Sequence, residues 1–259
     1  MPISTLHGLS LPDKNTIIWR YMDFSKFMSL LDKRCLFFSR ADLLGDPFEG
    51  SVTEQDVKYR EKFWERIIDA SRERGINVDE FRSKIPVIDS DVNEAFRKWT
   101  YVSCWHINNF DSIAMWKLYT SSKDAVAIRS TLGRLLECLE FSTDVFHIGQ
   151  VNYIDYTKDA SNHIGPFSYF NKSKAYVSEA ELRVITQVIP DHKIGTSYFS
   201  GEIAIGGVYI KVDLNRLIDK LFVPPGSQDW FKLMMKSIIE KYELAKEVSR
   251  TSLDDSPIF

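Results

Sequence analysis

The chain has 259 residues, 44% of them hydrophobic and 13% aromatic, which is enough apolar material to bury one large core or two small ones. With 33 basic and 36 acidic side chains its formal net charge is -3, which excludes an overall positive field that would attract nucleic acid or an anionic membrane. The three cysteines, at positions 35, 104 and 138, lie far apart in apolar surroundings, which favours reduced thiols over a disulfide framework or a zinc site.

Residues 1–15 have neither the basic start nor the hydrophobic middle of a secretion signal. No later apolar run is long enough to span a membrane. We therefore expect a cytoplasmic protein with no membrane partner, and the sequence leaves its oligomeric state open.

Residues 16–50 begin with a predicted strand and a predicted helix. The β-prone residues 17–19 predict a buried strand that ends with Arg20 and directs Tyr21 to the opposite face. Apolar residues then recur at helical spacing after Asp23, which can cap the first turn. This segment is therefore expected to bury one stripe of a short helix.

A second predicted strand and an acidic turn complete this unit. The apolar and aromatic run at residues 35–39 predicts the strand and places Ser39 at its end. Pro47 lacks a backbone donor and biases the residue before it to extended geometry, so Asp46 and Glu49 are presented on a rigid turn. The unit thus carries polar side chains where packing alone would not require them.

Residues 54–74 predict a long helix, because apolar side chains recur at helical spacing among many charges. Gly75 is a plausible end of this helix. The periodicity weakens over residues 76–90, around Pro86, which predicts a loop or a flexible insertion.

Strands and helices alternate over residues 100–154. The pattern predicts strands at 100–105, 125–129 and 146–154, a helix that begins at Asp111 or Ser112 and carries Tyr119, and a helix at 131–140. Histidines 106, 147, 163 and 192 do not have the spacing of metal ligands, so no metal site is predicted from them.

A second concentration of polar residues lies around Glu179 and Glu181. In an extended chain these two carboxylates and Arg183 share one face. One interpretation is a salt-bridge ladder on an edge strand, in which Glu181 pairs with an arginine or a lysine. The other is a carboxylate pair at the rim of a strand, available for general-base chemistry or for holding a sugar hydroxyl.

Residues 204–259 alternate in βαβαβ order. The whole chain therefore predicts an α+β fold, with a mixed, largely antiparallel central sheet, flanking helices and this C-terminal βαβαβ segment. We expect a single domain over residues 1–259. Its expected parts are a strand-helix-strand unit (1–53), a helical insertion (54–99), the central sheet (100–203) and the C-terminal segment (204–259).

Several stretches together resemble a bacterial family known as domain of unknown function 2971. They are IIWRYMDFSKFMSLLDKRCLFFSRADLLGDPFEGS, VSCWHINNFDSIAMWKLY, AVAIRS, VNYIDY, KSKAYVSEAELRVI and VDLNRLIDKLFVPP, and they cover nearly the whole chain in the expected order. The family name implies no settled activity, so function has to be sought from the site.

A more distant resemblance is to the ADP-ribosyltransferase superfamily. It rests on an arginine beside a tyrosine on a first strand, a helix, a hydroxyl residue on a second strand, and a late E-x-E before a strand. The resemblance implies that Arg20 holds the nicotinamide ribose and phosphate of NAD, the substrate. It also implies that Ser39 supports the nicotinamide pocket and that Tyr21 or Tyr119 stacks on the ring.

The same resemblance assigns the chemistry to the two glutamates. Glu181 would bind the ribose hydroxyl and stabilise the oxocarbenium ion that forms as nicotinamide leaves, because a fixed carboxylate in a dry pocket lowers that barrier. Glu179 would orient or deprotonate the acceptor, which the sequence leaves open as a protein, a nucleic acid or a small molecule. Such an enzyme is expected to be a bacterial toxin or an effector of phage defence.

Two other classes of function remain open. In the first, the carboxylates gather around Mg²⁺ or Mn²⁺, with Lys172 or Lys174 nearby, to hydrolyse a phosphodiester; the four carboxylates are Asp46, Glu49, Glu179 and Glu181. In the second, the chain is a binding or sensing module of a defence system. Arg20 would then be a buried ion-pair partner of Glu49 or Glu181.

Overall fold

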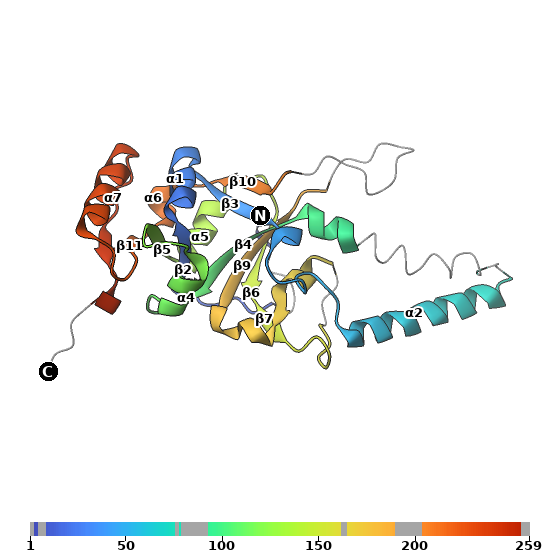
Figure 1. Cartoon of the computed structure of the whole chain (residues 1–259). Helices are drawn as coiled ribbons and strands as arrows, with labels where there is room; N and C mark the ends of the chain where they lie inside the picture. The colour runs from blue at the N-terminus through green and yellow to red at the C-terminus, as the bar shows by residue number, and fades with distance from the viewer. Residues whose placement is uncertain are drawn as a thin grey trace.

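A computed structural model describes residues 3–4, 9–75, 78, 93–161, 165–189 and 204–254. Its fold is α+β, with a mixed, mostly antiparallel sheet and helices packed on both of its faces, as the sequence predicts (Figure 1). The predicted flexible segment at 76–90, apart from Val78, lies outside the described residues, as do histidines 163 and 192.

The described part of the central sheet has ten strands. They are β1 (Ile3–Ser4), β2 (Ile17–Asp23), β3 (Cys35–Arg40), β4 (Thr100–Ile107), β5 (Ala125–Thr131), β6 (Phe146–Gln150), β9 (Glu181–Gln187), β10 (Gly207–Lys211), β11 (Lys220–Val223) and β12 (Val248–Arg250). The main path has the order β1-β6-β9-β4-β2-β5-β11-β12, and β3 pairs with both β4 and β10. Only β1–β6 and β11–β12 are parallel among these pairs. The short strands β7 (Asn152–Ile154) and β8 (Asn171–Ser173) form a separate parallel pair.

The α-helices of the described residues are α1 (Phe24–Lys33), α2 (Glu54–Glu73), α4 (Ile113–Tyr119), α5 (Leu132–Leu139), α6 (Leu214–Leu217) and α7 (Asp229–Lys241). Residues 93–99 are helical as well. The 3-10 helices are η1 (Ala41–Leu43), η2 (Gly165–Phe170), η3 (Lys174–Glu179) and η4 (Ser252–Asp254). The last five strands and helices before η4, from β10 to β12, have the predicted βαβαβ order.

The two faces of the sheet pack against different helices. On the face that we call the α1 face, α1, α5, α6 and α7 share the largest hydrophobic cluster with residues such as Ile18, Trp105 and Leu182. On the opposite face, which we call the α4 face, α4 packs on Trp19 and η2 packs on Ile185. Strand alternation and the pairing register assign each side chain of β2, β4 and β9 to one of these faces.

The sheet divides at β4. One edge of β4 pairs with β9 along its whole length. The other edge pairs with β3 at its start, where Ser39 lies opposite Val102, and with β2 at its end, where Trp19 lies opposite His106. Strands β2 and β3 therefore part from each other, and α1 connects them. We call this division the fork; it creates an opening in the sheet that a continuous ladder would close.

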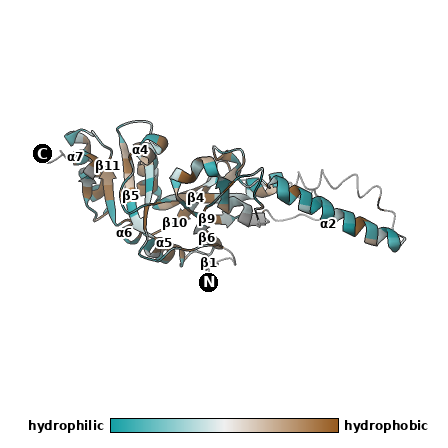
Figure 2. Ribbon diagram, turned by 90° about the horizontal axis from the view of Figure 1, so that it is seen from below, coloured by the Kyte–Doolittle hydropathy of each residue, from teal (hydrophilic) through white to brown (hydrophobic). Residues whose placement is uncertain are grey.

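The helix α2 confirms one sequence prediction and corrects another. It begins with a complete capping box, in which the Thr53 side chain accepts from the Asp56 backbone while the Asp56 carboxylate accepts from the Thr53 backbone. Gly75 follows its end with a φ of 73°. Its predicted apolar stripe is only partly covered, since Ile68 is buried but Phe63 is 49% exposed. Figures 1 and 2 show α2 projecting from the body that holds the sheet, and the colours of Figure 2 show that most of its residues are hydrophilic.

Three local expectations are corrected by tertiary contacts. Arg20 lies in the middle of β2 rather than at its end, because β2 continues to Asp23. The Asp23 carboxylate does not cap α1; it accepts from the backbone and hydroxyl of Ser121 instead. The predicted strand at 146–154 is two strands, because the backbone N–H of Val151 donates to Glu181 and the chain then turns away to pair with β8.

Candidate functional site

A cavity of about 680 Å³ lies at the fork, within the size range of roughly 300–1,000 Å³ that is usual for small-molecule sites. Its walls come from β2, α1, β3, β4, β10, the end of α4, the turn at residues 44–49 and the segment from β8 to β9. All of the predicted site residues line it: Arg20, Tyr21, Ser39, Tyr119, Glu179 and Glu181. The structure therefore brings these distant residues together in the wall of the same cavity.

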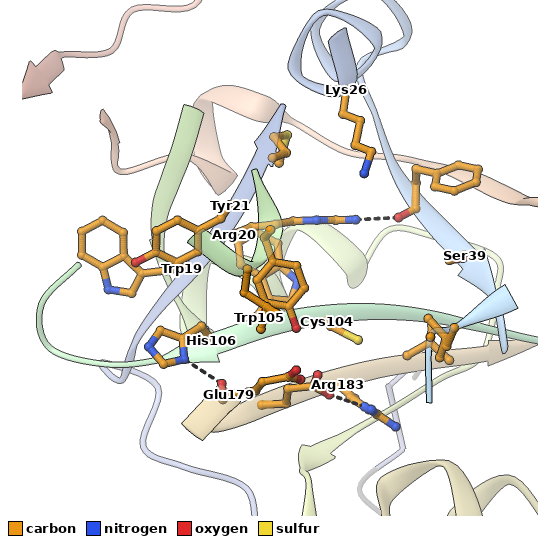
Figure 3. Close-up of a pocket in the computed structure, with 18 of the residues that line it drawn as sticks. Trp19, Arg20, Tyr21, Lys26, Ser39, Cys104, Trp105, His106, Glu179 and Arg183 are labelled. Carbon is orange, nitrogen blue, oxygen red and sulfur yellow. Dashed lines mark hydrogen bonds and ion pairs between the residues drawn. The ribbon is translucent and has the colours of Figure 1, made fainter. Parts of the chain in front are cut away.

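The Arg20 side chain bridges the fork, and Figure 3 shows the hydrogen bond that it donates to β3. One guanidinium nitrogen donates to the Ser103 hydroxyl on β4 at 3.0 Å, and the other donates to the Phe37 carbonyl on β3 at 2.8 Å. Both acceptors are neutral, and no salt bridge of Arg20 is found within the described residues. Burial lowers its pKa to about 10, so the group stays cationic at neutral pH. The site thus contains a positive charge that the neighbouring protein groups do not balance.

The ion pair expected of Arg20 is made by another arginine. The Arg183 guanidinium donates to both carboxylate oxygens of Glu49, at 2.6 and 2.7 Å, and its Nε donates to Glu181 at 2.6 Å. Arg20 is therefore not the partner of Glu49 or Glu181, contrary to the expectation for a purely structural module. Strand pairing explains the difference, since Arg183 and Glu181 lie on the α4 face whereas Arg20 starts on the α1 face and reaches the cavity through the fork.

The two glutamates of the E-x-E motif meet at a lysine. Lys172 Nζ donates to Glu179 at 2.5 Å and to Glu181 at 2.9 Å, and the three side chains are almost fully buried. Glu179 does not lie in an extended strand as predicted; it ends η3, and Ala180 then takes a left-handed conformation with a φ of 39°. The two carboxylates converge because this reversal, rather than strand alternation, turns Glu179 toward Lys172.

The strand that carries Glu181 is interior and not the predicted edge strand. β9 is paired on both sides, with β4 and with β6. The predicted pairing of Glu181 with an arginine or a lysine is confirmed, since one carboxylate oxygen accepts from Lys172 and the other from Arg183. Its charge is therefore fixed by two buried cations rather than exposed at a sheet edge.

Glu179 and Glu181 have opposite proton affinities. Burial, followed by a hydrogen bond to Glu181, raises the pKa of Glu179 to about 7. Burial would also raise the pKa of Glu181, but Arg183 and Lys172 outweigh it and lower that pKa well below its ordinary value. At neutral pH the site therefore holds one permanently ionised carboxylate beside one that exchanges its proton.

The acidic turn is attached to this pair. Asp46 is buried, and one of its carboxylate oxygens accepts from the Phe48 backbone at 2.9 Å. Gly50 has a φ of 70°, and a Cβ there would lie 2.2 Å from the Tyr169 ring, so the position requires glycine. Glu49, which lies between Asp46 and Gly50 in the sequence, accepts two hydrogen bonds from the Arg183 guanidinium. The DPFEG turn thus reaches Arg183, the partner of Glu181, from a point 134 residues earlier in the chain.

The two predicted ring-stacking tyrosines have different environments. Tyr21 is 7% exposed, its hydroxyl accepts from the Ser112 backbone, and its ring packs edge-on against Trp116. It forms part of the wall. Tyr119 is 38% exposed and lines the cavity, and burial together with the charges of Glu181 and Glu179 raises its pKa above the ordinary value. Tyr119 is thus the better placed of the two to contact a ligand ring.

His106 is a site residue that the sequence interpretation missed. Its Nδ1 lies 2.6 Å from the Glu179 carbonyl, which can only accept, so Nδ1 carries the hydrogen (Figure 3). Burial lowers the pKa of His106, and Nε2 has no hydrogen-bond partner within the described residues. His106 lies directly opposite Glu181 in the β4–β9 register, which identifies it as a site residue, but that register cannot be predicted from the sequence.

Two further findings concern metals and membranes. Among the described residues, no group of three or more histidine, cysteine or acidic side chains is arranged to hold a metal ion. Glu49, Glu179 and Glu181 do gather, as the hydrolase alternative expects, but Lys172 and Arg183 lie between them. Lys174, the other lysine of that alternative, pairs with Asp159 at the surface.

Among the helices of the described residues, every one is too short or too polar to cross a membrane.

Comparisons with known proteins complete the description of the site. Neither the protein-family models nor the curated proteins searched give a match to this sequence. The function therefore has to be inferred from the geometry of the cavity.

Proposed function

We propose that the protein is an NAD-dependent ADP-ribosyltransferase whose active site is the cavity at the fork. One observation carries the proposal. A single cavity has, in one wall, an arginine that has no acidic partner among the described residues and, in another, a carboxyl group whose pKa is raised to about 7. ADP-ribosyl transfer from NAD uses both groups. The arginine binds the anionic phosphates of NAD, and the carboxyl group takes the proton that the acceptor loses when it attacks the ribose.

In this proposal Arg20 binds the phosphate and ribose oxygens of NAD. A guanidinium has a planar set of donors that matches these oxygens, and hydrogen bonds to charged groups contribute about 1.5–3 kcal/mol each. Lys26 also lines the cavity and adds positive charge. Ser39 lines the wall on β3, and Tyr119 offers its ring to the nicotinamide.

The two glutamates divide the chemistry. The bond between the ribose C1′ and the nicotinamide nitrogen breaks, nicotinamide leaves with the electron pair, and positive charge develops on the ribose. Glu181 stays ionised and faces that charge from a fixed position. Glu179 accepts the proton that the acceptor loses as it bonds to C1′, because its pKa of about 7 suits a general base at neutral pH.

The test is transfer of label from NAD carrying a radiolabelled ADP-ribosyl group to components of a cell extract. We expect transfer by the wild type, and a loss of at least about a hundredfold in Glu179→Gln, which is the usual contribution of a general base. The matched control is Glu247→Gln, because Glu247 is 66% exposed and does not line the cavity. Treating the labelled product with protease or nuclease then identifies the acceptor as protein or nucleic acid.

Arg20 provides the second arm of the test. Arg20→Gln should weaken NAD binding by about tenfold or more, measured as a smaller thermal shift at fixed NAD, because a charge-assisted hydrogen bond is lost. Arg134→Gln is the control, since Arg134 is half-exposed and pairs loosely with Asp219. Absence of NAD binding and of label transfer in the wild type, together with cleavage of DNA or RNA on addition of Mg²⁺ or Mn²⁺, would instead favour the hydrolase.

If the activity is found, a role as a toxin or as an effector of phage defence becomes testable by expressing the wild type and Glu179→Gln in bacteria. We expect the wild type to slow growth and the variant not to. Equal growth of both strains, with label transfer intact in vitro, would remove the toxin proposal and leave the enzyme proposal in place.

A further inference from the structure

A pair of aromatic rings lies at the mouth of the cavity. Phe37 on β3 and Tyr209 on β10 are direct partners in the antiparallel register, and their ring centroids are 5.1 Å apart. Both side chains line the cavity, and they remain 37% and 50% exposed. A cross-strand aromatic pair stabilises a sheet, but that role alone does not require the rings to border a cavity.

The backbone of β10 at Gly207 packs against the Phe37 ring. A Cβ at position 207 would lie 2.5 Å from the tip of the Phe37 ring and 2.2 Å from the Phe38 carbonyl. Glycine at this position therefore lets the ring lie close against the β10 backbone. The part of the ring that does not face the backbone is left toward the cavity and solvent.

The surroundings of this pair are cationic. Lys33 Nζ lies 4.9 Å from the centre of the Tyr209 ring, and Lys26 belongs to the same cavity wall. The Arg20 guanidinium donates to the backbone carbonyl of Phe37, so its charge lies beside the strand that carries this ring, and both side chains line the same cavity. The acidic residues of the cavity lie elsewhere, on the DPFEG turn, at the end of η3 and on β9.

We propose that Phe37 and Tyr209 form a stacking subsite for the adenine of a nucleotide whose phosphates lie against Arg20 and Lys26. Aromatic side chains bind nucleobases by stacking, and an adjacent guanidinium supplies the charge that the phosphates need. This inference rests on the proposed function, because it assigns the half of NAD that the carboxylates do not contact. The dinucleotide then runs from the ring pair at the mouth, past Arg20, to Glu179.

Equilibrium binding of ADP to the full chain tests the subsite without any catalysis. ADP carries the adenine and both phosphates, whereas nicotinamide mononucleotide lacks the adenine. We expect Phe37→Leu and Tyr209→Leu each to weaken ADP binding by about tenfold, as expected when one base–aromatic stack is lost. Binding of nicotinamide mononucleotide should change less than about twofold. Phe110→Leu is the matched control, because Phe110 is 73% exposed and does not line the cavity.

Three outcomes would overturn the subsite. The first is the absence of ADP binding to the wild type. The second is equal ADP affinity in the wild type and in the variant that combines Phe37→Leu with Tyr209→Leu. The third is a loss of affinity of these variants for a single-stranded oligonucleotide without any loss for ADP. The last would place a nucleic-acid acceptor on the rings. Leucine keeps the side chains apolar, and circular dichroism of each variant establishes that it is folded. If the ring variants lose ADP affinity but the wild type does not transfer label, the subsite stands and only the enzyme proposal is overturned.

Discussion

Replacing Glu49 with glutamine tests the connection between the DPFEG turn and the carboxylate pair. Glu49 is 2% exposed and receives two hydrogen bonds from Arg183, which is fully buried. Glutamine has nearly the same size but no charge, and it offers Arg183 one oxygen where glutamate offers two. After the substitution, Glu181 is the only acidic partner left to Arg183 in the described residues, and Glu181 is shared with Lys172.

The magnitude follows from burial. Removing one partner of a buried ion pair costs about 3–5 kcal/mol, because the remaining charge stays buried without compensation. Glutamine keeps one acceptor, so we expect a loss of about 3 kcal/mol in the free energy of unfolding, at the lower end of that range. The same change in an exposed pair, Glu247→Gln opposite Lys220, should cost much less, because water screens the charges of that pair.

Urea unfolding followed by circular dichroism measures both variants against the wild type at pH 7. Equal slopes of unfolding free energy against urea would show that the comparison reports stability rather than a change in compactness. A loss in Glu49→Gln no larger than that in Glu247→Gln would refute the reasoning, because it would mean that Arg183 is compensated without the DPFEG turn.

Three further predictions concern single positions. Glu179 binds its proton more tightly in the folded protein than in the unfolded chain, so the free energy of unfolding of the wild type should fall as pH rises from about 4.5 to about 7. In Glu179→Gln, urea unfolding at a series of pH values should show a smaller fall across this range. Gly50→Ala should lower the free energy of unfolding by about 1–3 kcal/mol more than Gly75→Ala, because both have positive φ but only Gly50 faces the Tyr169 ring; equal losses would show that backbone strain alone decides. Thr53→Ala should cost about 1 kcal/mol by removing the cap of α2, and no change in the unfolding midpoint would contradict the capping role.

The ion pair with Glu49 and Glu181 was expected of Arg20 but is made by Arg183, and the strand arrangement explains the difference. Arg20 and Arg183 both lie on central strands, and each is a few residues from an acidic side chain in the sequence. Strand alternation and the β4–β9 register put Arg183 on the α4 face with Glu181. Arg20 instead lies on β2 at the fork, with neutral acceptors on β3 and β4.

Much of the fold follows from local sequence. Apolar periodicity predicted α1, α2, α5 and the C-terminal βαβαβ order, because the spacing of side chains that one helix or strand buries depends on that element alone. Predictions failed where a neighbour competed for the chain. Residues 146–154 alternate as one strand, yet they divide between two sheets. The ladder with β9 ends where the Val151 backbone donates to Glu181, and residues 152–154 then pair with β8.

By itself the sequence determined which residues carry charge, hydroxyl and ring, and it indicated that Arg20, Tyr119, Glu179 and Glu181 belong to one site. The tertiary structure decided what each of them does there. It opened the fork that lets Arg20 reach the cavity, and it brought Glu49 to Arg183 across 134 residues. Burial and ion pairing act through space, so they fixed the charge of Glu181 and left Glu179 to titrate.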